Sequence, residues 1–297
     1  MKKSIYFIIN PIAGTDEPIL SHIARTFQNS KWDWDIGVTR GKDDVAILTK
    51  KAIHDNADII CVYGGDGTVS EVARILHKTS VPMAILPGGS ANIIAKDLKI
   101  PVDTLSILKS ICKGTYKIKP VDMLLSHQIP MLVGYVVGAW ADVVTHTKRK
   151  DKARIGQLAY GLTALEYLPK NTEAMYTFRL DDAEPFEIQG SMVFIANVGN
   201  IGITGMSLAP NIKIDDELLD ILVIQSVEIK TVIEWLHSTV TNRKPKILLK
   251  HWKCKKMHVT MKPRQSVLAD DVLKSCTAID VEVSPHSLQI VLPYGKV

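Results

Sequence analysis

The chain of 297 residues has few cysteines and contains no long apolar run. Its four cysteines (Cys61, Cys112, Cys254 and Cys276) are widely spaced, which indicates neither a disulfide framework nor a zinc site. No stretch approaches the roughly 18 apolar residues of a membrane-spanning helix. The first apolar run ends at Ile9, too early for the core of a signal peptide. These absences predict a cytoplasmic protein whose contact with membranes is peripheral.

Composition and charge further limit the class of protein to which the chain can belong. Hydrophobic residues make up 46% of the chain and charged residues 23%, the balance of a folded globular protein. The length favours one large or two medium domains. A net charge of +5 favours anionic partners such as nucleotides or anionic lipid surfaces. The basic segments contain no nucleic-acid recognition motif, so no nucleic-acid partner is expected, and the sequence leaves open whether the chain forms a homo-oligomer.

The first third of the chain alternates between strand-like and helical patterns. Strands are predicted at residues 5–9, 34–38, 58–63 and 83–86, several of them as continuous apolar runs. Helices are predicted at 19–27, 46–53, 69–76, 93–98 and 104–112. This alternation predicts an α/β domain over residues 1–120, with a parallel sheet covered by helices on both faces.

After Asp122 the pattern becomes rich in β-branched and apolar residues. We expect strands within 131–144, 172–180, 186–198, 218–224, 248–261 and 278–292. Helical patterns interrupt them at 157–167 and 229–238. A β-rich second domain is therefore predicted at 121–297, with the last few residues returning to the first domain.

The strongest motif is Gly64-Gly65-Asp66-Gly67-Thr68, directly after a predicted buried strand. Glycines let the backbone adopt positive φ and approach a ligand closely, and consecutive amides in such a turn suit phosphate oxygens. The segment from Thr68 to Glu71 reads as a capping box that would start a helix facing the anion. The alternative is a tight turn without a ligand.

Two further loops of small residues follow predicted strands: Asn10-Pro11-Ile12-Ala13-Gly14 and Pro87-Gly88-Gly89-Ser90-Ala91-Asn92. In the second of them Ser90 could donate to a phosphate oxygen and Asn92 could hold the loop. Ligands of open α/β sheets bind beyond the carboxyl ends of the strands. The three loops are therefore expected to converge on one phosphate-binding site.

These motifs together resemble the diacylglycerol kinase catalytic domain family, which includes bacterial lipid kinases and the sphingosine and ceramide kinases. The resemblance covers nearly the whole chain and extends through the segments at 118–122, 156–160, 197–210 and 215–220. It implies an ATP-binding α/β domain followed by a β-sandwich-like domain for the lipid substrate.

The resemblance also assigns roles to residues. ATP would contact Asn10, Pro11, Ile12, Ala13, Gly14, Thr39, Gly64, Gly65, Asp66, Gly67, Thr68, Glu71 and Ser90. Mg2+ would be bound by Asp216 with the main-chain carbonyls of Lys213 and Leu218. Asp66 and Asp122 would extend the acidic network toward the metal.

The resemblance places the catalytic base at Asp270, which would accept the proton of the lipid hydroxyl. The family pattern here is Asp-Gly-Glu, whereas this chain has Asp270-Asp271-Val272. It also departs from the pattern at Glu217, where the family has glycine, and at Ile93, where it has aspartate. The alternative for the paired aspartates is a solvated turn.

Two basic segments, 147–154 and 250–256, could dock the chain on an anionic membrane, and the second contains Trp252. The alternative is a solvated charged face. The sequence thus predicts a lipid kinase that transfers the γ-phosphoryl group of ATP to a lipid alcohol such as diacylglycerol. An NAD-kinase-like enzyme and a non-catalytic nucleotide- or lipid-binding relative stay open as alternatives.

Overall fold

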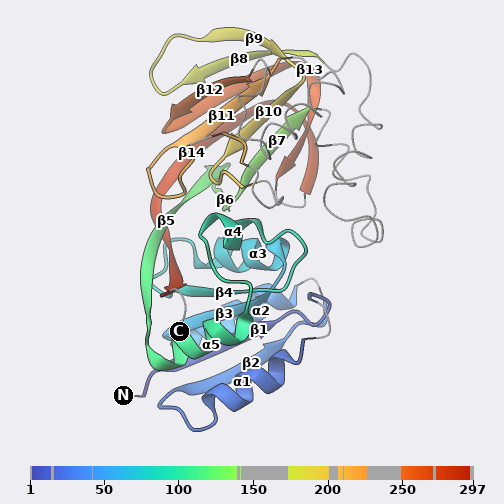
Figure 1. The fold of residues 1–297 in the computed structure, drawn as a ribbon. Coiled ribbons are helices and arrows are strands. Elements are labelled where there is room, and N and C mark those ends of the chain that lie inside the picture. Colours follow the sequence, from blue (N-terminus) through green and yellow to red (C-terminus); the bar gives the residue numbers. More distant parts are fainter. Residues whose placement is uncertain are drawn as a thin grey trace, which may run out of the picture. The chain divides into compact units, whose positions relative to one another are not determined.

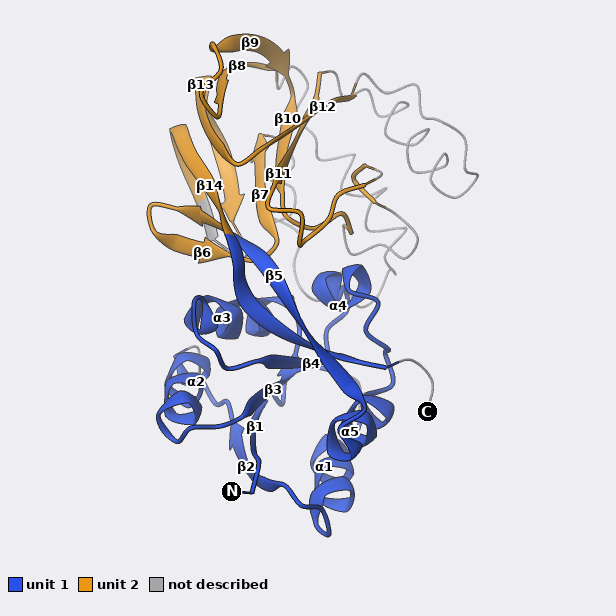
Figure 2. Cartoon of the chain, turned by 90° about the vertical axis from the view of Figure 1, so that its left-hand side faces the viewer, with its two compact units in different colours: residues 1–123, 285–297 blue, residues 124–284 orange. Residues whose placement is uncertain are grey.

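The computed structural model of the chain describes residues 2–14, 17–41, 43–138, 141, 173–200, 207–209, 211–225, 249–269 and 272–294. The chain forms two compact units, shown by ribbon in Figure 1 and by colour in Figure 2. Unit 1 contains residues 1–123 and 285–297, and unit 2 contains residues 124–284. Strands β5 (Tyr116–Ser126) and β14 (Val272–Pro293) each contribute residues to both units.

Unit 1 is built on a parallel sheet in the order β14-β4-β3-β1-β2. Its first four strands in sequence are β1 (Ser4–Ile9), β2 (Asp33–Val38), β3 (Ile59–Gly64) and β4 (Met83–Pro87). β3 lies inside the sheet, and every one of its residues is buried. Burial on both faces explains why these strands are continuous apolar runs in the sequence, as predicted.

Helices cover both faces of this sheet. They are α1 (Ile19–Phe27), α2 (Asp44–His54), α3 (Asp66–Leu76), α4 (Ile93–Asp97) and α5 (Thr104–Lys113). Figure 2 shows α2 and α3 on one face and α1 and α5 on the other. The predicted fold class of the first domain is therefore confirmed.

The ends and the buried sides of these helices follow from local sequence. In α1 the buried residues Ile19, Ile23 and Phe27 recur every four positions and so lie on one side of the helix. α5 begins after Asp103, whose carboxylate accepts a hydrogen bond from the Leu105 amide at 3.1 Å. It ends at Gly114, which adopts the left-handed conformation with φ of +73°.

The C-terminal part of β14 lies in unit 1. Ile290 pairs with Met83 of β4 in parallel register. Asp122 of β5 is fully buried, and its Oδ1 accepts a hydrogen bond from the His286 amide at 2.7 Å. This carboxylate thereby joins β5 to β14.

Unit 2 is made of antiparallel strands in the order β12-β11-β10-β7-β13-β14. The strands not yet named are β6 (Ile129–Met131), β7 (Gly134–Gly138), β8 (Ala174–Leu180), β9 (Phe186–Gly190), β10 (Met192–Ala196), β11 (Leu219–Ile224), β12 (Leu249–Cys254) and β13 (Lys256–Ala269). The first half of β13 pairs with β8, and its last three residues pair with β7. One long strand thus belongs to both halves of a β-sandwich-like domain, as the resemblance implied.

The core of unit 2 is formed by inward-facing side chains of these strands, among them Val193, Ile221 and Met257. Aromatic residues extend it, because the Phe178 ring stacks on Tyr176 at 6.2 Å and on Phe186 at 5.7 Å between centroids. Alternate residues of a strand point to opposite faces, so one face of each strand supplies this core.

The predictions about two helices of the second domain, the cysteines and membrane spans can also be compared with the described residues. The helices predicted at 157–167 and 229–238 lie outside them. All four cysteines have free thiols, and Cys61 is fully buried as predicted. Within the part of the chain that the structure describes, no helix is long and apolar enough to cross a membrane.

Candidate functional site

The first predicted loop forms a tight turn directly after β1. Asn10 donates its amide hydrogen to the Tyr63 carbonyl at 2.9 Å, and its Oδ1 accepts from the Ile12 amide at 3.1 Å. Its side-chain Nδ2 also donates to Thr68 Oγ1 at 2.9 Å. Asn10 therefore connects the first loop to the glycine-rich turn.

Tyr63 packs against two of the loops and leaves little room for a Cβ at either contact. Gly14 has a φ of +92°, and a Cβ there would overlap the Tyr63 hydroxyl. A Cβ at Gly88 would lie 3.1 Å from Cζ of the same ring. The buried Tyr63 side chain thus brings the first and third loops to a common support.

The glycine-rich turn differs from its predicted form in two respects. No residue of the turn from Gly64 to Thr68 has positive φ, and the N-cap Gly65 has a φ of −85°. Helix α3 begins at Asp66, three residues before the predicted helix, so Thr68 lies inside its first turn. The predicted capping box is therefore wrong, because Thr68 bonds to Asn10 instead of capping the helix.

Glycine is needed in this turn for close backbone contact. A Cβ at Gly89 would lie 2.6 Å from the Cα of Gly65, a separation that real Cβ atoms do not show. A Cβ at Gly64 would lie 2.7 Å from the Cβ of Thr68. The glycine-rich turn and the third loop therefore touch through their backbones, and the predicted convergence of the three loops is confirmed.

Asn92 closes the third loop, as predicted. Its Oδ1 accepts from the Gly89 amide at 2.8 Å, and its Nδ2 donates to the Gly89 carbonyl at 2.7 Å. Asn92 itself adopts the left-handed region with φ of +48°, which asparagine tolerates better than most residues. The loop is therefore fixed by one side chain.

Asp66 joins the glycine-rich turn to the third loop. Its Oδ1 accepts from the Ile93 amide at 2.6 Å. Burial raises the pKa of this carboxyl, while the amides of Ile93, Ile94 and Asn92 oppose that rise. The carboxylate is thus directed at the start of α4, and its contribution to an acidic network stays a prediction.

The other predicted nucleotide contacts lie around these loops. Thr39 directly follows β2, is buried, and donates its amide hydrogen to the Ile9 carbonyl at 2.9 Å. Ser90 is exposed in the third loop, and Glu71 is partly buried in α3. The remaining predicted contacts are exposed or half-buried and belong to the first loop or to α3: Pro11, Ile12, Ala13 and Gly67.

The arrangement suits a phosphate group. The first amides of a helix have no acceptor within that helix, and Asp66, Gly67 and Thr68 form this part of α3. A Cβ at Gly65 would have only the Gly89 Cα within 4 Å, at 3.5 Å, so a ligand can approach that backbone. No lysine or arginine occurs in the three loops, so the anion would be bound by amides.

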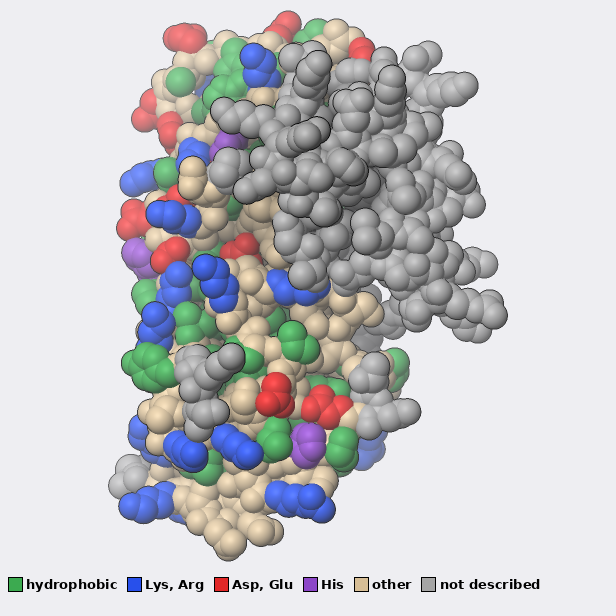
Figure 3. All heavy atoms as spheres, in the orientation of Figure 1, with side chains coloured by type: hydrophobic (Ala, Val, Ile, Leu, Met, Phe, Trp, Pro, Cys, Tyr) green, Lys and Arg blue, Asp and Glu red, His purple; other side chains and the backbone are tan. Residues whose placement is uncertain are grey.

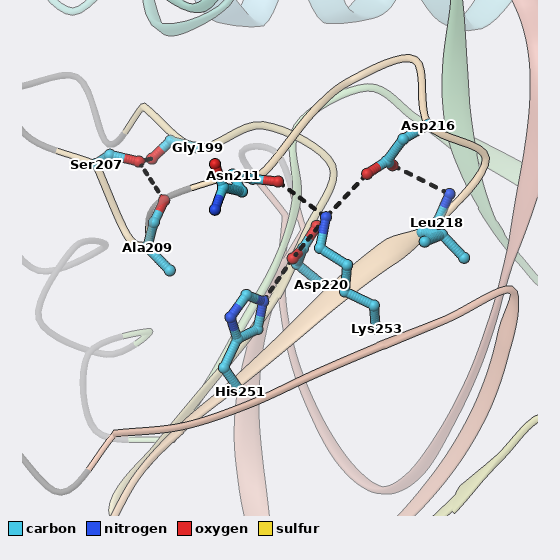
Figure 4. Close-up of polar contacts among 9 residues, drawn as sticks. All are labelled: Gly199, Ser207, Ala209, Asn211, Asp216, Leu218, Asp220, His251 and Lys253. Atoms are coloured by element: carbon cyan, nitrogen blue, oxygen red, sulfur yellow. Dashed lines mark hydrogen bonds and ion pairs between the residues drawn. The ribbon is translucent and has the colours of Figure 1, made fainter.

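The predicted metal residue Asp216 lies in a different environment, among charged side chains of unit 2 (Figure 4). Its Oδ2 is 2.8 Å from Lys253 Nζ, and its Oδ1 accepts from the Leu218 amide at 3.3 Å. Lys253 also donates to the Asn211 carbonyl at 2.9 Å. Lys213 lies in the same loop and is exposed.

Asp220, the second residue of β11, completes this cluster. It is fully buried, with Oδ1 at 2.5 Å from His251 Nε2 and at 3.5 Å from Lys253 Nζ. Its Oδ2 has no hydrogen-bond partner among the described residues. Burial raises the pKa of Asp220, whereas the bond to His251 and the charge of Lys253 lower it.

These contacts do not fit the magnesium site that the resemblance implied. An ammonium group already pairs with the carboxylate that was expected to bind the metal. The expected binding of Mg2+ by Asp216, Lys213 and Leu218 is therefore not supported by this geometry.

Sequence reasoning missed the roles of Lys253, His251 and Asp220. The signal was present in the alternation of β12, in which His251 and Lys253 share one face. Asp220 is paired with Lys253 in the antiparallel register of β11 and β12. That pairing could be recognised only once the two strands were known to be neighbours.

The basic segment at 250–256 is not a uniform charged face. Trp252 stacks near Phe178 and Phe186 in the aromatic core, and Cys254 is buried. Lys253 lies within the ionic cluster, which leaves Lys250, Lys255 and Lys256 exposed. Trp252 is thus partly buried against the aromatic core, and its contact with a membrane stays a prediction.

Two predicted features lie outside the described residues, namely the basic segment at 147–154 and the catalytic candidate Asp270. Figure 3 shows one face of the molecule, on which Lys and Arg side chains form several separate groups with acidic residues between them. The roles of the segment at 147–154 and of Asp270 stay predictions.

A hollow of about 500 Å³ lies elsewhere on unit 1, lined by Lys2, Lys3, Lys31, Trp32, Cys112, Lys113 and Gly114. Lys2 and Lys3 precede β1, and Trp32 precedes β2, so this hollow lies near the amino ends of these parallel strands. The three glycine loops lie at the carboxyl ends. The hollow is therefore separate from the candidate phosphate site.

Comparison with known proteins agrees with this division of the chain. Residues 4–125 match the family model described as diacylglycerol kinase catalytic domain. Residues 135–292 match the model described as YegS C-terminal NAD kinase beta sandwich-like domain. The boundary between the two matches falls close to the boundary between the two compact units.

Individual proteins give the same result. The chain is 30% identical over 238 residues to a Klebsiella pneumoniae protein named "Probable lipid kinase YegS-like", covering 77% of this chain and 76% of the relative. It is 24% identical over 235 residues to "Diacylglycerol kinase" of Staphylococcus carnosus, covering 77% and 75%. A crystal structure of a diacylglycerol kinase from Bacillus anthracis has the same fold, with a TM-score of 0.75, 24% identity and coverage of 98% and 97%.

Proposed function

The chain belongs to the diacylglycerol kinase catalytic domain family, and on this basis we propose that it is an ATP-dependent lipid kinase. The observation that carries the proposal is the backbone contact of Gly65 with Gly89 beside the start of α3. Such close packing leaves backbone amides, without side chains, to face a ligand. The proposed reaction transfers the γ-phosphoryl group of ATP to the hydroxyl of a lipid such as diacylglycerol.

Unit 1 supplies the nucleotide site in this proposal. The amides at the start of α3 would bind phosphate oxygens, and the helix dipole favours negative charge at this end. Asn10, Asn92 and Asp66 would keep the three loops in place, because each bonds from one loop to another or within its own loop. The preorganised loops would then bind the phosphates through their amides without having to rearrange.

The transfer step needs a proton acceptor. The lipid hydroxyl oxygen attacks the γ-phosphorus, the bond from that phosphorus to the bridging oxygen of ADP breaks, and the hydroxyl proton leaves to a base. The family resemblance assigns that base to Asp270. In this chain Val272 replaces the glutamate of the family motif and Asp271 replaces its glycine, so the second carboxylate stands one position earlier than in the family.

The test is phosphoryl transfer from labelled ATP in magnesium buffer to a panel of lipid alcohols in mixed micelles. We expect one lipid to be phosphorylated, Asp270→Asn to abolish transfer, and Gly65→Ala to raise the KM for ATP. Gly41→Ala is the matched control, because a Cβ at Gly41 would have nothing within 4 Å. Transfer that survives in Asp270→Asn would remove Asp270 from the mechanism.

The alternatives are outcomes of the same assay. NAD belongs in the acceptor panel because the second domain matches a model described as NAD kinase beta sandwich-like. Phosphorylation of NAD alone would replace the lipid-kinase proposal. ATP binding without transfer to any acceptor would indicate a non-catalytic relative.

A lipid acceptor also implies that the chain approaches a bilayer from its surface. The basic segment at 147–154 is the candidate contact, since Trp252 and Lys253 of the other segment face inward. Co-sedimentation with anionic liposomes should fall at high salt and after charge reversal at Lys148, Arg149 and Lys150. Binding that ignores both changes would contradict this contact.

A further inference from the structure

The loop before β11 surrounds a cationic group that belongs to the chain itself. Three oxygens face Lys253 Nζ: the Asn211 carbonyl at 2.9 Å, Asp216 Oδ2 at 2.8 Å and Asp220 Oδ1 at 3.5 Å. An ammonium group has three donors, and here it has three acceptors. Figure 4 shows Lys253 between these residues, with His251 on the other side of Asp220.

We propose that Lys253 is the resident cation of this loop, so that residues 211–220 take their conformation without a divalent metal. The resemblance to the family placed magnesium at Asp216, and the structure places the lysine ammonium on the same carboxylate. The inference concerns the structure of unit 2 and does not depend on which molecule accepts a phosphoryl group.

The first argument is the occupancy of the carboxylate oxygens. Asp216 has partners at both oxygens, the Leu218 amide and Lys253. Asp220 binds His251 and Lys253 through the same oxygen, Oδ1. A divalent ion at Asp216 would have to displace the ammonium or lie beside its positive charge.

The second argument is how Lys253 is held. Strand pairing sets Lys253 opposite Asp220 and His251 opposite Leu222, so the cluster is positioned by the ladder of β11 and β12. The side chain of Lys253 is 28% exposed, and that of Asp220 is fully buried. Burial alone lowers the pKa of Lys253, but Asp216 and Asp220 raise it above its ordinary value.

The third argument is the need for charge compensation. A fully buried carboxylate such as Asp220 is stable only with a charged or hydrogen-bonding partner. Lys253 serves Asp216 and Asp220 at once, and His251 adds a bond to Asp220. Lys253 is thus a positioning residue: it holds the loop of Asp216 against the end of β11.

The experiment measures thermal unfolding of the full chain without nucleotide, in EDTA and in MgCl2 at matched ionic strength. We expect the wild-type midpoint to be the same in both. Lys253→Met should lower the midpoint by about 5 °C in EDTA, the effect of losing a half-buried ion pair in a chain of this size. Its midpoint should rise in MgCl2, because the vacated oxygens can then bind the ion. Lys253→Arg should retain most of the wild-type midpoint.

Lys255→Met is the matched control, because Lys255 carries the same charge and pairs with Glu217 of the same loop at 3.8 Å, with 70% of its side chain exposed. The proposal is overturned if Lys253→Met loses no more stability than Lys255→Met. It is also overturned if MgCl2 stabilises the wild type and Asp216→Asn removes that stabilisation. The second comparison does not require Lys253→Met to fold.

Discussion

The loops of the two units differ in what fixes their conformation and in how charged side chains are arranged around them. The three loops of unit 1 contain no lysine or arginine, and their shape is fixed by glycine contacts and by bonds from Asn10, Asn92 and Asp66. In unit 2 the loop of Asp216 is fixed by polar side chains, because Lys253 pairs with Asp216 and Asp220 and His251 bonds to Asp220. The three loops of unit 1 therefore present backbone amides without basic side chains, whereas the carboxylates of Asp216 and Asp220 in unit 2 are already paired with Lys253.

This difference determines how each region should respond to substitution. A contact between two backbones cannot relax by movement of a side chain, and Gly65 directly follows β3 while Gly89 lies two residues after β4. Removing one partner of an ionic cluster leaves a buried charge without compensation, which is destabilising. Water, another cation or protonation can offset part of that cost.

Gly89→Ala should cost about 3 kcal/mol of unfolding free energy, since its Cβ would meet the Gly65 Cα at 2.6 Å. Gly65→Ala should cost under about 1 kcal/mol, because its Cβ would lie at an ordinary 3.5 Å from the Gly89 Cα. Urea unfolding of both variants measures the difference. Equal losses would mean that the loops are not in rigid contact, and the contrast between the units would fail.

The same pair separates folding from binding. Gly65→Ala should fold normally and still bind ATP more weakly, because the added methyl group occupies the side that is open to a ligand. Titration of the folded variant with ATP measures this directly. An unchanged affinity would show that the phosphates do not approach Gly65.

The fold of unit 1 could be predicted from sequence because its strands are continuous apolar runs and its helices have clear periodicity. The prediction of a capping box at Thr68 was wrong because a tertiary contact competes with the local pattern. Asn10, which is distant in the sequence, donates a hydrogen bond to the Thr68 hydroxyl. The convergence of the loops could be predicted, since it follows from the parallel sheet. The requirement for glycine at Gly89 could not be predicted, because it depends on how closely the backbone of Gly65 approaches.

The ionic cluster of unit 2 was hidden for a related reason. Lys253 lies in a run of basic residues that reads as a solvated or membrane-facing surface. Only the pairing of β11 with β12 brings it to Asp220 and Asp216. A single sequence shows which residues share a face of a strand, but not which strand lies beside it.

A pH titration tests Asp66, the carboxyl group that joins the glycine-rich turn of unit 1 to the start of α4. Because burial raises the pKa of Asp66, the folded chain binds more protons than the unfolded chain above the ordinary carboxyl pKa of about 3.9. Its contribution to stability is complete below that value and is lost as pH rises through the raised pKa. Each unit of the rise corresponds to about 1.4 kcal/mol.

Asp66→Asn should remove this pH dependence, and its oxygen can still accept from the Ile93 amide. The unfolding free energy of the wild type, measured relative to the variant, should therefore decline as pH rises above about 4. Asp33→Asn is the control, because it removes an exposed carboxyl group from the same unit. Parallel curves for wild type and Asp66→Asn would contradict the assignment.

The smallest effect is expected at Glu217, where the ionic loop of unit 2 imposes a strained backbone. Glu217 has a φ of +59°, which costs a non-glycine residue about 1–2 kcal/mol. Glycine removes this strain but adds about 0.5–1 kcal/mol of unfolded-state entropy. Glu217→Gly should therefore raise the unfolding free energy by about 0.5 kcal/mol. The exposed pair with Lys255 at 3.8 Å adds little to either side. Glu217→Ala removes the carboxylate but keeps the strain, so an equal gain in that variant would assign the effect to charge instead of backbone.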